Sequence, residues 1–96
     1  MAGPIRLMSD DIPAIPPRCR LQWEPAQNAH VLLYPEGMVK LSQSAAEILK
    51  QLDGVRTLFA ILVNLEQAFP GADLRSDVIE FLTTAYDRGW IVLSNR

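Results

Sequence analysis

The chain has 96 residues, of which 49% are hydrophobic and 21% are charged. A chain of this length forms one compact domain with a modest core, and this composition is too apolar for a wholly disordered protein. The formal net charge is −2, so the clustered basic surface of a nucleic-acid binder is not expected. No apolar run approaches the roughly 18 residues that span a membrane, and the start of the chain does not resemble a secretory signal.

The cysteine content indicates a reducing compartment. Cys19 is the only cysteine, so it cannot form an internal disulfide. Chains without disulfides are typical of the cytosol. We therefore expect a cytoplasmic protein that is not attached to a membrane.

Residues 1–17 are predicted to form a Pro-rich N-terminal tail, followed by a domain over residues 18–96. Prolines at positions 4, 13, 16 and 17 lack a backbone donor and fix φ, which opposes regular structure. Terminal segments of this kind are commonly held loosely. We expect the same of this tail.

Residues 18–41 show the patterns of three short strands. Cys19, Leu21 and Trp23 alternate with polar residues, which is typical of a half-buried strand. A continuous run of β formers follows at residues 30–34, and turn formers flank it on both sides. The segments predict an antiparallel meander in which the third strand, residues 38–41, is a free sheet edge.

After the strands the apolar residues repeat with a period of 3.6, which predicts three helices. Capping serines and stop residues mark the ends of these helices. The predicted boundaries are Ser42 or Ser44 to Gly54, Thr57 to Pro70, and Asp73 to Gly89. The apolar stripe of the second helix is Leu58, Ile61, Leu62, Leu65 and Phe69. The predicted fold class is α+β and winged-helix-like, a three-stranded antiparallel meander followed by three helices.

The chain offers few residues for catalysis. His30 is the only histidine and begins an apolar strand, where packing explains it better than acid–base chemistry. Cys19 alternates within a strand and is interpreted as a core residue rather than a nucleophile. No spacing of Cys, His, Asp or Glu predicts a metal site. We expect a protein that is not an enzyme and that has no cofactor and no metal.

Winged-helix proteins commonly bind DNA, so DNA binding is an alternative function for the predicted fold. The third predicted helix carries Arg75 and Arg88 against the carboxylates of Asp77, Glu80 and Asp87. A recognition helix normally brings basic and amide side chains to the phosphates and bases. DNA binding therefore remains the less favoured alternative.

Two apolar surfaces fall outside the predicted core. Phe59 and Val63 share a face of the second helix at i, i+4. This face is either a surface for a partner or a surface that the tail or a neighbouring element of the same chain covers. Ile79 and Tyr86 flank the apolar stripe of the third helix. The predicted edge strand leaves unpaired N–H and C=O groups that a further extended chain can pair with.

Several motifs resemble the PqqD family of pyrroloquinoline quinone (PQQ) biosynthesis, which contains recognition elements for ribosomally made peptides. The resemblance covers roughly residues 18–92, and its strand region is the most specific part. The motifs are Arg20-Leu21-Gln22-Trp23, His30-Val31-Leu32-Leu33-Tyr34-Pro35-Glu36-Gly37, Ser44-Ala45-Ala46-Glu47-Ile48-Leu49, Asp53-Gly54-Val55-Arg56-Thr57, Pro70-Gly71-Ala72-Asp73-Leu74 and Asp77-Val78-Ile79-Glu80-Phe81-Leu82.

The resemblance implies a peptide carrier without chemistry of its own. In that family the protein binds the precursor peptide PqqA as an added strand and presents it to PqqE, a radical SAM enzyme. The peptide would lie on the third-strand edge, in a cleft beside the third helix. The residues implied on the strand are Met38, Val39, Lys40 and Leu41, and those implied on the helix are Val78, Ile79, Leu82, Thr83 and Tyr86. A proline at Val39 is predicted to remove ladder donors and weaken binding without unfolding the domain.

Under a third hypothesis, the chain is a purely structural subunit. Its Phe59 and Val63 side chains would attach it to an enzyme or to other subunits of an oligomer. The sequence leaves open whether the chain forms a homodimer.

Overall fold

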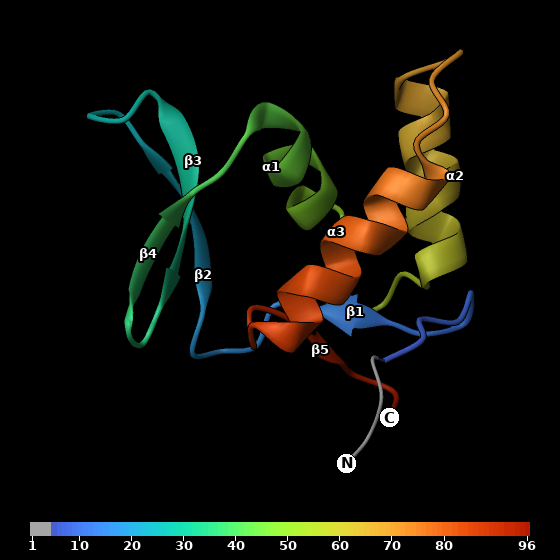
Figure 1. Cartoon of the computed structure of the whole chain (residues 1–96), viewed down its shortest axis with the longest axis horizontal. Coiled ribbons are helices and arrows are strands. Elements are labelled where there is room, and N and C mark those ends of the chain that lie inside the picture. Colours follow the sequence, from blue (N-terminus) through green and yellow to red (C-terminus); the bar gives the residue numbers. More distant parts are fainter. Residues whose placement is uncertain (1–4) are drawn as a thin grey trace.

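The computed structural model describes residues 5–96, so residues 1–4 of the predicted tail lie outside the described residues. A three-stranded sheet lies on one side of the molecule and three helices lie on the other, with α2 farthest from the sheet (Figure 1). The elements are β1 Pro13–Ala14, β2 Arg20–Glu24, β3 Ala29–Tyr34, β4 Gly37–Lys40, α1 Gln43–Lys50, α2 Leu58–Ala68, α3 Arg75–Asp87 and β5 Val92–Leu93. Within residues 5–96 no helix is long and apolar enough to cross a membrane.

The main sheet is an antiparallel meander in the order β2-β3-β4, which confirms the predicted fold class. Leu32 in β3 lies opposite Leu21 in β2 and Val39 in β4. Residues directly opposite each other project from the same face of a sheet. This face packs on the helices, because Leu21, Leu32 and Val39 all belong to the core cluster or pack against it.

The starts of the first two helices follow from their capping residues. The Ser42 side chain accepts a hydrogen bond from the backbone N–H of Ala45, and Thr57 caps α2 in the same way through Ala60. The predicted cap at Asp73 is wrong. The residue before α3 is Leu74, whose conformation is already helical and which gives no side-chain cap bond.

The central core is built from the three helices and one face of the sheet. Its largest fully buried side chains include Leu32, Leu49, Ile61 and Leu82. Four of the five residues predicted as the apolar stripe of α2 are buried. Phe69 is the exception, because it follows the end of the helix and its side chain is 46% exposed.

Residues 5–17 are bound to the domain by backbone hydrogen bonds, so the expectation of a loosely held tail is wrong for them. β1 pairs with β5 in a small antiparallel sheet. The carbonyls of Ser9 and Asp11 accept hydrogen bonds from Phe59 and Leu58, the first N–H groups of α2. These N–H groups have no partner within the helix. Residues 5–17 therefore form a strap that caps α2.

A partly buried ion pair connects the strap to the C-terminal residue Arg96. The Asp11 carboxylate is 4% exposed and accepts hydrogen bonds from the Arg96 guanidinium at 2.8 and 2.9 Å. The Met8 backbone N–H donates to the same carboxylate at 2.6 Å. The Arg96 bonds, aided by the Met8 N–H and opposed by burial, lower the pKa of Asp11 below its ordinary value of 3.8.

The lowered pKa of Asp11 predicts an acid-sensitive contribution to stability. Because the folded-state pKa lies below the unfolded one, the contribution is full above pH 3.8 and is lost as the pH falls through the folded-state pKa. Asp11→Asn should lower the melting temperature at neutral pH, and the difference from wild type should shrink as the pH falls below 3.8. Asp10→Asn removes the same charge one residue away and is the control in these thermal melts. A difference for Asp11→Asn that stays constant with pH would contradict the prediction.

Candidate functional site: the free edge of β4 and the flank of α3

The main chain of β4 is free along one edge of the sheet. The Leu41 N–H donates to the His30 carbonyl at 3.0 Å, so these opposing residues form a hydrogen-bonded pair. In an antiparallel ladder the bonding direction alternates from one residue to the next. Val39 therefore bonds toward β3, whereas the N–H and C=O groups of Met38 and Lys40 point away from the sheet.

The side chains of the four predicted strand residues divide between the two faces of the sheet. Met38 and Lys40 are exposed on the outer face. Val39 is half-buried against the core, and Leu41 is buried within it. The outward main-chain groups and the exposed side chains of this edge thus come from the same two residues.

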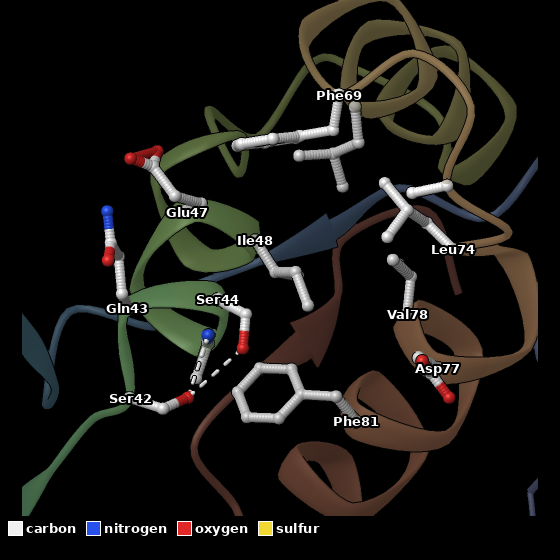
Figure 2. Close-up of a pocket in the computed structure, with 13 residues that line it drawn as sticks. Ser42, Gln43, Ser44, Glu47, Ile48, Phe69, Leu74, Asp77, Val78 and Phe81 are labelled. Carbon is white, nitrogen blue, oxygen red and sulfur yellow. Dashed lines mark hydrogen bonds between the residues drawn. The ribbon is translucent and has the colours of Figure 1, made fainter.

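One flank of α3 faces the segment that follows β4. The Phe81 ring points toward Ser42 and Ser44, which follow β4 (Figure 2). At the other end of the helix, the Arg88 guanidinium lies 5.3 Å from the Trp90 ring centroid. The Trp90 ring in turn lies 6.2 Å from that of Tyr34, the residue opposite Gly37 of β4.

Spacing along the helix adds Thr84 to this flank. At 3.6 residues per turn, Thr84 and Arg88 lie within about 60° of Phe81 around the helix axis. Both are exposed. We call the outward main chain of Met38 and Lys40, together with Phe81, Thr84 and Arg88, the edge site.

The structure does not bring the five predicted helix residues together at the edge site. Val78 and Leu82 are 2% and 0% exposed and belong to the core. Ile79, Thr83 and Tyr86 lie about 140–200° around the axis from Phe81. The hydrogen bonds that Arg96 donates to Asp11 are the main cause of the raised pKa of the Arg96 guanidinium, and the nearby Tyr86 makes a smaller contribution to it. This second flank therefore faces the C-terminal end of the chain.

A pocket of about 650 Å³ opens where α1, the end of α2 and the start of α3 meet. Figure 2 shows Ile48, Phe69 and Phe81 around this space, with Gln43 and Glu47 directed away from it. We call it the α1–α3 pocket. Its lining residues are Ser42, Gln43, Ser44, Ala45, Glu47, Ile48, Leu65, Phe69, Ala72, Leu74, Asp77, Val78 and Phe81.

The predicted partner surface lies on α2, on the side of the molecule away from β4 (Figure 1). Phe59 is 55% exposed, and Val63 is half-buried one turn later. The strap reaches the start of this helix through main-chain bonds but leaves the Phe59 side chain in solvent.

The histidine and the cysteine have packing contacts. The His30 ring meets the Trp23 ring edge-on at 5.1 Å, and the Cys19 thiol is buried 3.9 Å from the Gly89 carbonyl oxygen. Across the described part of the chain, no three His, Cys, Asp or Glu residues gather as a metal site would require.

The sequence matches known proteins over most of its length. The family model described as "Coenzyme PQQ synthesis protein D (PqqD)" matches residues 29–91. A PqqA binding protein of Azotobacter vinelandii is 56% identical over 85 residues, which cover 88% of this chain and 92% of that protein. A PqqA binding protein of Stutzerimonas stutzeri is 53% identical over 75 residues, covering 77% and 82%.

A solved structure has the same fold. It is the solution structure of the PqqD part of Methylobacterium extorquens PqqCD, described as a functional and stand-alone ribosomally synthesized and post-translationally modified (RiPP) recognition element. It is 27% identical, with a TM-score of 0.78, and the match covers 93% of this chain and 97% of that one. The family match, the relatives and the shared fold agree with the strand motifs of the sequence, and the chain belongs to the PqqD family.

Proposed function

We propose that this chain binds the PqqA precursor peptide of PQQ biosynthesis by adding it as a further strand to β4. The observation that supports this most directly is the outward main chain of Met38 and Lys40 at the free edge of the sheet. An extended peptide that pairs there gains main-chain hydrogen bonds. The relatives named for PqqA binding identify the peptide.

The edge site gives such a peptide two kinds of contact. An antiparallel strand exchanges N–H and C=O bonds with Met38 and Lys40, at a net ~0.5–1.5 kcal/mol each. Side chains on the inner face of the added strand meet Phe81 and the exposed Thr84 of α3. Several such bonds with one or two buried apolar side chains correspond to dissociation constants on the order of micromolar or below. The role requires no chemistry by the protein itself, and we place it in the cytoplasm.

Isothermal titration with the PqqA peptide, beside a scrambled peptide of identical composition, tests the proposal. Saturable binding of PqqA alone is expected, because the side-chain order must match the pockets beside the edge. Equal binding of both peptides, or of neither, would contradict the proposal.

The two flanks of α3 are expected to differ in their effect on peptide affinity. Phe81→Ala removes a large apolar contact beside the edge and should raise the dissociation constant about tenfold. Tyr86→Ala removes another aromatic ring from the opposite flank of the same helix and should leave affinity unchanged. Titration of both variants, each first shown to be folded by circular dichroism, decides between the flanks. A loss confined to Tyr86→Ala would place the peptide on the opposite flank.

We also propose that Phe59 and Val63 form the surface that meets PqqE when the peptide is presented. An exposed aromatic side chain on α2 is a common anchor of protein interfaces. Because α2 lies away from β4, the enzyme and the peptide would occupy different sides of the carrier (Figure 1).

Phe59→Ser should therefore weaken binding to PqqE by about tenfold or more, since interface aromatic residues commonly contribute over 1 kcal/mol. PqqA affinity should stay at the wild-type value. Pull-down on immobilised PqqE and peptide titration measure the two effects separately. If peptide affinity falls and PqqE binding remains, the two surfaces have been assigned the wrong way round.

A further inference from the structure

The α1–α3 pocket begins where the free edge of β4 ends. Lys40 is the last residue of β4, and the pocket wall starts two residues later with Ser42. A strand rises about 3.3 Å per residue. A peptide paired with Met38 and Lys40 would therefore reach the mouth of the pocket within a few residues.

The walls of the pocket are suited to an apolar side chain. Residues from three helices converge on it, with Ile48 from α1, Phe69 at the end of α2, and Val78 and Phe81 from α3 (Figure 2). A volume of about 650 Å³ lies within the range of ligand sites, roughly 300–1,000 Å³. The half-exposed Phe69 gains a partner if a bulky apolar group enters.

Two acidic residues at the pocket disfavour a further carboxylate beside the inserted side chain, although the Glu47 carboxylate is directed away from the space itself (Figure 2). Glu47 and Asp77 are the charged residues among those that line it. Glu47 lies 3.5 Å from Lys50, so its charge is partly offset, and Asp77 stands exposed in the first turn of α3. Like charges repel, so a carboxylate next to the inserted side chain is disfavoured.

The direction of β4 determines which end of the peptide reaches the pocket. β4 runs toward α1, so an antiparallel partner has its N-terminal end beside Lys40 and Ser42. We infer that the α1–α3 pocket takes one bulky apolar side chain from the peptide segment just N-terminal to the residues that pair with β4. This inference rests on the proposed function. The inserted side chain would make binding selective for the sequence of the peptide.

Two pocket variants and a control test this inference with the PqqA peptide of Azotobacter vinelandii as the probe. Phe69→Ala removes a wall of the pocket, and Ala72→Trp fills it from an exposed loop position. Each should raise the dissociation constant about tenfold, the effect of losing one buried apolar side chain. Met8→Ala truncates an apolar side chain of similar exposure, 50% against 46% for Phe69, outside the pocket. It should bind as wild type does.

Alanine replacement of each apolar peptide residue locates the inserted side chain. One replacement, N-terminal to the paired segment, should weaken binding about tenfold, and Phe69→Ala should add little further loss to it because both remove the same contact. If the coupled residue instead follows the paired segment, the inferred direction is overturned.

The edge variant Lys40→Pro separates this inference from the proposed function. If both pocket variants bind like wild type while Lys40→Pro binds weakly, the pocket inference is overturned and the edge mechanism stands. If wild type does not bind the peptide, or Lys40→Pro binds it fully, the proposed function fails and the pocket inference fails with it.

Discussion

Lys40→Pro is expected to raise the dissociation constant for the PqqA peptide by about 10- to 100-fold while the domain stays folded. The ring removes an N–H that points away from the sheet, so no bond of the β3–β4 ladder is lost. A peptide carbonyl would then face the edge without a donor, which costs about 1–3 kcal/mol when the group is buried. Isothermal titration measures the affinity, and circular dichroism verifies the fold.

Lys40→Ala is the matched control, because it removes the same side chain and keeps the N–H. It should bind within about twofold of wild type, since an exposed lysine side chain contributes little. Equal losses for the alanine and proline variants would assign the effect to the lysine charge and would reject pairing through the main chain.

A proline at Val39, the position suggested by the sequence alone, would not make this distinction. The Val39 N–H is directed toward Leu32 in β3, as the bond from Leu41 to His30 establishes for this ladder. Its loss would weaken the hairpin itself. A drop in affinity would then report unfolding as well as binding.

Leu82→Ala is expected to lower the free energy of unfolding by about 2–5 kcal/mol, because it leaves a cavity in the core. Leu82 is fully buried at the centre of α3, and a domain of this size has a total stability of only about 5–15 kcal/mol. Urea titration followed by circular dichroism measures the change. A loss below about 1 kcal/mol, within the range of surface substitutions, would contradict the core assignment.

Ile79→Ala is the matched control, since it truncates a half-buried aliphatic side chain on the same helix and should cost less. Peptide affinity, corrected for the folded fraction, should be close to wild type for Leu82→Ala. Had Leu82 been a direct peptide contact, affinity would fall in the folded molecules as well.

The sequence predicted the elements of the fold from local patterns. Alternation at Cys19, Leu21 and Trp23 and the apolar run at residues 30–34 predicted the strands of the meander, because a strand exposes successive side chains on opposite faces. The expected burial of Trp23 is wrong, since this residue is 49% exposed. The 3.6-residue period of the apolar side chains and the capping residues predicted the three helices. Ser42 and Thr57 cap the first two of them. The family followed from the same strand motifs, and the family match and relatives confirm it.

Local pattern could not decide how the elements meet. Prolines at residues 13, 16 and 17 predicted a loose tail, yet residues 5–17 form a strap, because the start of α2 and β5 supply partners from distant parts of the chain. Composition cannot reveal partners more than 40 residues away.

The same limit applied to the edge site. The 3.6 period identifies the buried stripe of α3, which includes Val78 and Leu82, but both sides of that stripe look alike in sequence. Only the packing of Phe81 near Ser42 distinguishes the flank on the β4 side from the flank of Tyr86. Likewise, sequence named β4 as an edge, but the hairpin register decided that Met38 and Lys40 present their main chain outward. Sequence thus identified most of the buried residues of the helices, with Phe69 and the strand residue Trp23 as exceptions, and tertiary contacts determined which exposed groups lie together.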